Sequence, residues 1–183
     1  MSVEGAFSLA AMALAAAATI GCGSFGKTAQ GRVVAYNRQT RQMTLIPEAP
    51  AASKAVTVSA PADPDEMGPA PVAGGLMLLD TRGRRMVIYD WPAQSFRTIT
   101  YTPLEERHNV QGAHLPLVDR AHKTITVYSR KDHLSITFHA ANDLLDLPAD
   151  TWQWGDVVRY YYKNPAQALR LMNVSQTDLS KST

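Results

Sequence analysis

The chain has a single cysteine among its 183 residues, Cys22, so no disulfide can form within it. A strong excess of one charge is also lacking, because 18 basic residues stand against 16 acidic ones and leave a net charge of +2. Such a small excess argues against nucleic acid as a partner. No apolar run reaches the roughly 20 residues that a membrane-spanning helix needs. Stability must therefore come from the packing of apolar side chains.

Motifs of common enzyme classes are missing as well. The sequence contains neither a Gly-x-Ser-x-Gly nucleophile elbow nor a phosphate-binding loop. Nothing in the spacing of serine, histidine and aspartate points to a catalytic triad, and no cofactor motif is present. We therefore expect a non-catalytic protein without a cofactor, with an envelope hydrolase of unknown type as one alternative.

What the chain does have is an apolar N-terminal run of about 16 residues, from Ala6 to Gly21, that ends at Cys22. Its length is typical of the core of a secretory signal peptide. The last residues, Thr19-Ile20-Gly21-Cys22, resemble the lipobox of bacterial lipoproteins. Two features depart from that family: Thr19 stands where leucine is usual, and the only charge before the run is Glu4.

The resemblance implies that residues 1–21 are a signal peptide and that Cys22 is lipidated and becomes the new N-terminus. Several lipid chains would then hold the protein stably at a membrane. No aspartate follows Cys22, which in lipoproteins favours the outer membrane, with the protein facing the periplasm. Residues 22–30 are expected to form a flexible tether. Cleavage at an Ala-x-Ala site within Ala15–Ala18 and an uncleaved hydrophobic helix are the alternatives.

Beyond the tether, the same pattern of predicted strands occurs twice in the sequence. Four segments recur in order at a spacing of 80 to 83 residues, which indicates an internal duplication. Each segment alternates apolar and polar side chains, as a half-buried strand does. The aligned segments are 37–46 with 119–128, 56–60 with 136–140, 75–78 with 155–158, and 86–90 with 169–173.

These patterns predict an all-β, mostly antiparallel fold made of two repeated five-stranded units, residues 31–102 and 112–175. A linker at 103–111 would separate them, and residues 176–183 would form a C-terminal tail. Residues 142–150 predict a short helical turn in the second unit. Each unit resembles an OB-like barrel in strand order only. Small barrels or sandwiches of another topology are the alternative.

All five histidines lie between His108 and His139, which raises the possibility of a metal site. If a four-residue loop closes the hairpin after Tyr128, Tyr128 faces His133 and His122 faces His139. Two imidazoles on neighbouring strands suit zinc, copper or nickel, but a zinc site needs a third ligand. His122 and His139 are therefore weak candidates for a periplasmic metal site.

Two other groups carry hypotheses. Aromatic side chains gather at Trp152, Trp154 and Tyr160–Tyr162, where a stacking surface for a ligand competes with core packing. Arginines flank Gly83 in a predicted hairpin turn and would suit an anionic partner. The function that we expect is a binding or scaffold module of the cell envelope, attached to the membrane through its lipid and presenting a β surface to an envelope protein.

Overall fold

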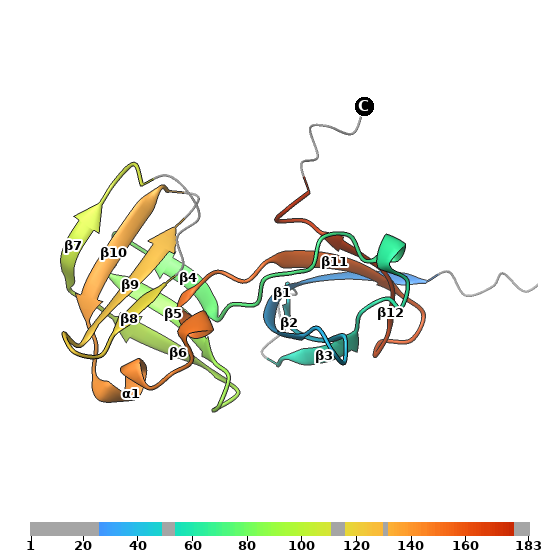
Figure 1. The fold of residues 1–183 in the computed structure, drawn as a ribbon, viewed down its shortest axis with the longest axis horizontal. Coiled ribbons are helices and arrows are strands. Elements are labelled where there is room, and N and C mark those ends of the chain that lie inside the picture. Colours follow the sequence, from blue (N-terminus) through green and yellow to red (C-terminus); the bar gives the residue numbers. More distant parts are fainter. Residues whose placement is uncertain (1–25, 49–53, 111–115, 130–131, 178–183) are drawn as a thin grey trace, which may run out of the picture.

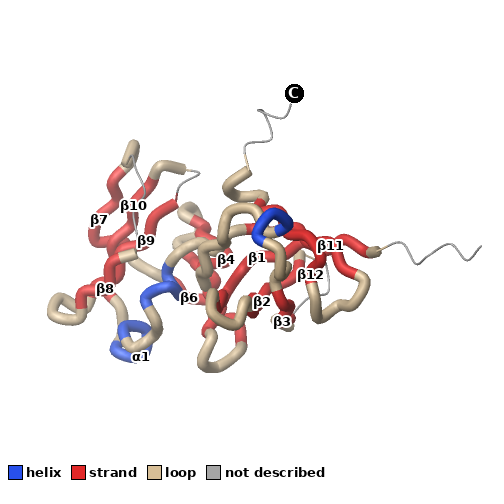
Figure 2. Tube along the Cα trace, turned by 45° about the vertical axis from the view of Figure 1, so that its right-hand side comes forward, coloured by secondary structure: helices blue, strands red, loops and turns tan. Residues whose placement is uncertain are grey.

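The computed structural model describes residues 26–48, 54–110, 116–129 and 132–177, and it confirms the all-β expectation. The predicted signal peptide, Cys22 and most of the predicted tail lie outside these residues. Figure 2 shows how little helix the described part contains. Its strands are β1 (Lys27–Asn37), β2 (Gln42–Pro47), β3 (Val56–Ser59), β4 (Leu76–Asp80), β5 (Arg85–Asp90), β6 (Ser95–Thr100), β7 (Pro103–Arg107), β8 (Leu117–Asp119), β9 (Thr124–Ser129), β10 (Leu134–His139), β11 (Val157–Tyr162) and β12 (Ala168–Asn173).

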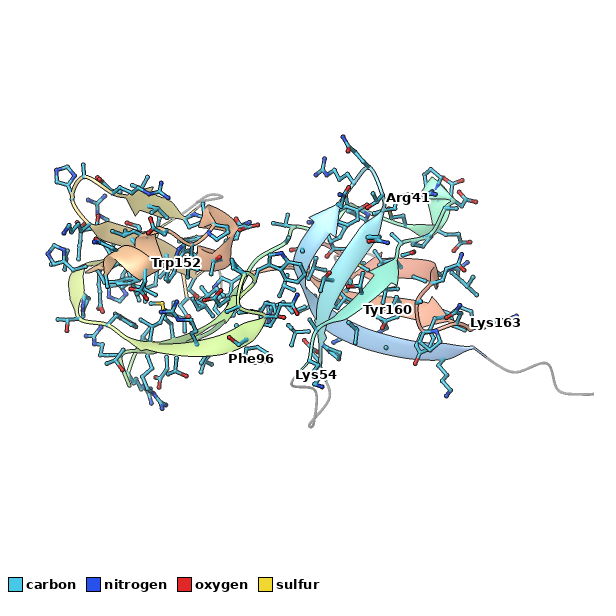
Figure 3. The ribbon with its side chains drawn as sticks, turned by 90° about the horizontal axis from the view of Figure 1, so that it is seen from below. Arg41, Lys54, Phe96, Trp152, Tyr160 and Lys163 are labelled. Atoms are coloured by element: carbon cyan, nitrogen blue, oxygen red, sulfur yellow. The ribbon has the colours of Figure 1, made fainter. Side chains whose placement is uncertain are left out.

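The strands form two lobes that lie side by side, and the chain passes between them twice (Figure 1). The first, which we call the split lobe, combines both ends of the described chain in one sheet of order β12-β11-β1-β2-β3. A parallel bridge between Ser59 and Gln167 brings β3 beside β12 and so closes the sheet on itself. Its core includes Val33, Met43 and Leu45, and Tyr160 packs there from β11 (Figure 3).

The second lobe, which we call the inserted lobe, is one continuous segment from β4 to Trp152. Its sheets have the orders β4-β5-β6 and β7-β10-β9-β8. Two short helical elements complete it, α1 (Asn142–Leu145) and the 3-10 turn η2 (Ala149–Trp152). Its core is larger and more aromatic than that of the split lobe. Phe138 packs against both Tyr101 and the fully buried Trp152. Figure 3 places Trp152 inside this lobe.

The predicted division into units 31–102 and 112–175 is wrong. Strand β11 of the second predicted unit pairs with β1, at the start of the first, and β12 pairs with β11, while β4 to β6 belong with β7 to β10. The predicted linker 103–111 contains β7, which pairs with β10, and the predicted tether loses Lys27–Gln30 to β1. Period-two alternation identifies a strand, but it does not identify the strand's partner, and nearest-in-sequence pairing was the wrong choice here.

Matched contacts in the two lobes support the predicted duplication. The turns before β2 and β9 place Arg41 and Lys123 in the left-handed region, at φ 55° and 53°. Their carbonyl oxygens accept the backbone N–H groups of Ala60 and Ala140, at 2.8 and 2.9 Å. A threonine pair bridges the next two strands in each lobe, Thr44–Thr57 in one and Thr126–Thr137 in the other.

Two local predictions have mixed outcomes. The helical turn in the second half is confirmed as α1, although its N-cap position is Ala141 and not the expected Asn142. The β9–β10 hairpin keeps the predicted core face but pairs Tyr128 with Ser135 instead of His133. Ser129, which the prediction placed in the turn, pairs with Leu134 at the end of β9, and this moves each partner by two positions.

Candidate functional site

The narrow junction between the lobes is the most constrained part of the fold. The chain crosses it at Gly74–Gly75 and again at Gln153–Asp156, and the two crossings are joined by a bridge between Gly75 and Trp154. The backbone of Val33 in β1 is hydrogen-bonded to both crossings. Its N–H donates to Asp156 O at 2.9 Å, and its C=O accepts from Gly74 N at 3.0 Å. The crossings and β1 therefore form one hydrogen-bonded unit.

Glycine is required where the crossings meet because no side chain fits. A Cβ added to Gly155 would lie 2.0 Å from the Val33 carbonyl oxygen, and one added to Gly74 would lie 2.3 Å from the Gln153 carbonyl oxygen. Gly75, which the repeat aligns with Gly155, has the Thr151 and Tyr89 backbone within 2.9 Å of the same position. All of these distances are below 3.0 Å, which is closer than a Cβ atom approaches a neighbouring heavy atom in proteins.

An apolar contact fixes the lobes against each other beside these crossings. Tyr89 of β5 packs with Val34 and Ile46 of the split lobe, and all three side chains are buried. Burial raises the pKa of Tyr89, so the ring stays a neutral phenol. Two surface grooves are lined by residues of both lobes, and the first of them includes Val34 and Tyr89 of this contact.

The first groove, which we call the Trp91 groove, encloses about 670 Å³. Asn37, Arg38 and Gln39 from the β1–β2 turn line its split-lobe side, while Trp91 and Asp150 line its inserted-lobe side. Trp91 remains 39% exposed although its ring contacts Tyr89, at 6.2 Å between centroids. The groove is therefore lined by an exposed aromatic ring and by polar side chains.

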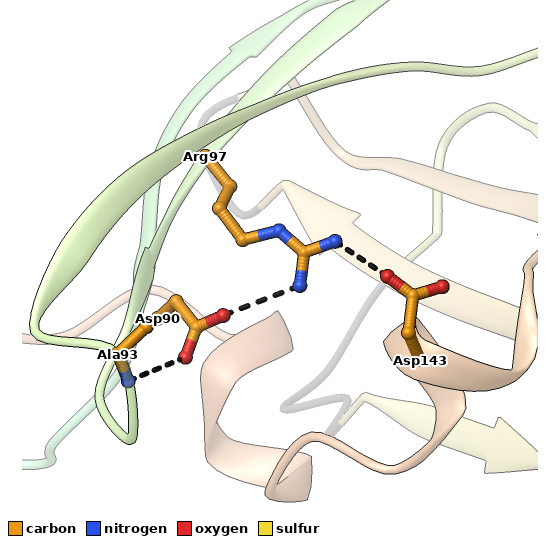
Figure 4. A network of polar contacts seen from close by, with 4 residues as sticks. All are labelled: Asp90, Ala93, Arg97 and Asp143. Carbon is orange, nitrogen blue, oxygen red and sulfur yellow. Dashed lines mark hydrogen bonds and ion pairs between the residues drawn. The ribbon is translucent and has the colours of Figure 1, made fainter.

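A charged network holds the turn that carries Trp91 (Figure 4). Asp90, which is 5% exposed, accepts a hydrogen bond from the backbone N–H of Ala93 at 3.0 Å. Arg97 reaches Asp90 with one guanidinium nitrogen at 3.2 Å and Asp143 of α1 with the other at 2.6 Å. The hydrogen bond from Arg97 lowers the pKa of Asp143. The position of Trp91 is thus linked to β6 and α1.

The second groove, which we call the Trp154 groove, encloses about 560 Å³ and contains Arg32. The Arg32 guanidinium lies 5.1 Å from the centre of the Trp154 ring and donates to Gly155 O at 2.8 Å. Burial lowers the pKa of Arg32, while the charges of Glu48 and Asp156 oppose that effect. Arg32 therefore ties β1 to the second crossing.

The predicted histidine pair does not form. His139 lies opposite Thr124, two positions from the expected partner, and its side chain is exposed. His122 lies on an exposed turn, where its Nδ1 is 2.7 Å from Asp119 Oδ2, and this contact lowers the pKa of Asp119. Among the described residues, no three histidine, cysteine or acidic side chains gather where they could hold a metal ion.

The other sequence hypotheses have clearer outcomes. Tyr160 and Tyr162 share a face, with ring centroids 5.4 Å apart, and Tyr161 lies on the opposite face, as alternation predicts. The hairpin turn at Gly83 is confirmed between β4 and β5. Two of its arginines already have carboxylate partners: Arg84 pairs with Glu106, and Arg85 pairs with Asp80.

Sequence reasoning missed Trp91 and Arg32. A tryptophan in a turn between two short strands, followed by Pro92, is an unusual position and could have been singled out. Arg32 gave no such sign, because a lone arginine in an alternating strand reads as a surface residue. Its role arises only from the crossing of distant segments.

One protein family matches nearly the whole chain, over residues 24–182, and its description is "Domain of unknown function (DUF4881)". The chain belongs to the DUF4881 family. The matched region begins after Cys22 and includes both lobes and both grooves. No curated protein and no solved structure matches the chain. In the part of this DUF4881 member that the structure describes, no helix is long and apolar enough to cross a membrane.

Proposed function

We propose that this DUF4881 member is a non-catalytic binding module of the bacterial cell envelope, anchored by lipid on Cys22 and recognising its partner at the junction of the two lobes. The observation that carries the binding role is the composition of the grooves. In the described residues, neither groove is lined by a histidine or a cysteine, whereas both combine an exposed or half-buried tryptophan with polar side chains. Such a combination of aromatic and polar side chains suits the recognition of a ligand.

The anchoring role rests on the N-terminal sequence and on the position of the first strand. The β1 strand begins at Lys27, only a few residues after Cys22, and it is hydrogen-bonded along its length to β11 and β2. A lipidated Cys22 would therefore hold the split lobe close to the membrane surface. The family match, which starts at residue 24, leaves the apolar run outside the shared domain and supports its role as a separate leader.

Substitution of the cysteine tests the anchor. We expect the Cys22→Ser full-length protein to lose its lipid and to leave the outer-membrane fraction, because both the acylation site and the cleavage signal are gone. The Ser24→Ala variant is the matched control and should stay with the membrane. Intact-mass measurement of the wild-type protein should show an acylated cysteine at the N-terminus. An unmodified thiol, or outer-membrane retention of Cys22→Ser, contradicts the proposal.

A further inference from the structure

The Trp91 groove has the size and the rigidity of a ligand site. Its volume of about 670 Å³ lies within the range of small-molecule sites, roughly 300–1,000 Å³. Trp91 belongs to a packed aromatic cluster. The Tyr89 ring contacts the Trp91 ring and also meets the Phe96 ring edge-on, at 5.3 Å between centroids. A rigid, amphipathic indole binds with little loss of conformational entropy.

The polar wall of the groove is free to bind a ligand. The side chains of Arg38, Gln39, Gln42 and Asp150 are exposed and make no hydrogen bond to other described residues. Carboxamides carry both donors and acceptors, and so does each hydroxyl group of a sugar. Unpaired amides opposite an exposed indole therefore match a ligand that is polar at its edges and apolar on one face.

The charge of the groove narrows the class of ligand. Arg38 and Asp150 are the charged side chains among its described lining residues, so their charges cancel. A phosphorylated or sulfated ligand would find no excess of cations, and a purely apolar ligand would leave the amides without partners. A pyranose ring satisfies both walls, because its C–H face packs on an aromatic ring while its hydroxyl groups bond to planar polar side chains.

We propose that the Trp91 groove binds a neutral oligosaccharide, whose sugar ring packs on Trp91 and whose hydroxyl groups bond to the β1–β2 turn. This inference rests on the proposed binding function and names the ligand class of that junction. Because the two walls come from different lobes, the sugar bridges the split lobe and the inserted lobe.

Binding can be measured on the full chain in lipid nanodiscs, because neutral sugars do not partition into lipid. The probes are chitotriose, cellotriose and maltotriose, followed by proton saturation transfer from protein to sugar. We expect saturable binding of at least one trisaccharide. We expect Trp91→Ala to weaken it at least about tenfold, as loss of a buried aromatic contact does. The exposed Gln39→Ala should weaken it about threefold to tenfold, the effect of one hydrogen bond.

Tyr161→Ala is the matched control, because Tyr161 is exposed to a similar degree, 36%, but lies outside the groove. Its affinity should equal that of the wild-type chain. Absence of saturable binding by all three sugars overturns the inference, as does equal affinity of wild type and Trp91→Ala. Tighter binding of a sulfated trisaccharide than of its neutral form also overturns it. None of these outcomes affects the lipid anchor, which the Cys22→Ser fractionation tests separately.

Discussion

The two lobes use equivalent strands but close them differently. In the split lobe β11 pairs with β1 over six positions, and β12 meets β3 at the Ser59–Gln167 bridge. The repeat aligns β12 with β5 and β3 with β10. In the inserted lobe, β5 and β10 are separated by two further strands: β6 pairs with β5, and β7 pairs with β10. The inserted lobe is therefore built from two sheets, β4-β5-β6 and β7-β10-β9-β8.

At one buried position that the repeat aligns, the inserted lobe holds the larger side chain. The repeat aligns Val58 in the split lobe with Phe138 in the inserted lobe, and both are fully buried. Phe138 packs on Trp152, and the described residues of the split-lobe core include no tryptophan. Because the inserted lobe is also one continuous segment, we infer that it is the more independent of the two, and that the split lobe depends on it.

The strongest test of this dependence is Phe138→Ala, which should lower the free energy of unfolding by about 3–5 kcal/mol through the cavity it leaves. We expect amide hydrogen exchange to accelerate in both lobes. Once the inserted lobe unfolds, it becomes a long loop between β3 and β11, and closing such a loop opposes their association. Normal protection of β1 and β11 in this variant would show that the split lobe stands alone.

Leu45→Ala is the reciprocal change in the split lobe, where Leu45 is 1% exposed. It should lower stability by about 2–5 kcal/mol by the same cavity mechanism. Here the faster exchange should be confined to β1–β3, β11 and β12, because β4–β10 are joined without passing through the split lobe. Acceleration in β9 and β10 to the same degree would mean that the lobes unfold as one unit.

The junction is tested by Gly155→Ala, which places a methyl group against the Val33 carbonyl. We expect a loss of about 3 kcal/mol, measured by urea denaturation, because backbone on both sides must move. Gly68→Ala is the control: its φ of +61° adds strain of about 1 kcal/mol, but the nearest atom to its Cβ is 3.6 Å away. Equal losses in the two variants would show that the crossings are not tightly packed.

The smallest expected effect concerns two exposed ion pairs, one in each lobe. The hydrogen bond from Arg170 lowers the pKa of Glu66, and that from Arg97 lowers the pKa of Asp143. Their stabilisation is therefore present above the ordinary carboxyl pKa of about 4 and is lost as the pH falls through the lowered values. In an NMR titration of the Glu66 and Asp143 carboxyls, Arg170→Gln should raise the pKa of Glu66 and leave that of Asp143 unchanged, and Arg97→Gln should do the reverse. A shift of both carboxyls by either variant would reveal coupling between the lobes.

Local patterns in the sequence predicted the strands, and the structure shows where such patterns stop being informative. Alternation placed Ile125, Val127 and Phe138 on the core face, and all three are fully buried. The repeat also paired Gly75 with Gly155, one glycine from each crossing. Which strands pair could not be predicted, because β1 has no sequence feature that selects β11 over a strand of its own half.

The candidate site was less predictable than the fold for the same reason. The Trp91 groove joins the β1–β2 turn to the β5–β6 turn and η2, which are far apart in the sequence. The histidine hypothesis failed because it depended on a hairpin register, and the register shifted by two positions places Thr124, not His122, opposite His139. A site made by distant segments can be read only once their pairing is known.

The separation of the split lobe's strands sets an order of events during synthesis. Chains emerge from the ribosome N-terminus first, so β1, β2 and β3 appear early, with an apolar face against which β11 and β12 pack in the folded protein. The inserted lobe is complete once Trp152 has emerged, before the last two strands are available. The growing chain therefore carries an incomplete split lobe through most of its synthesis. The strands made last, β11 and β12, complete the lobe that contains the N-terminal strand.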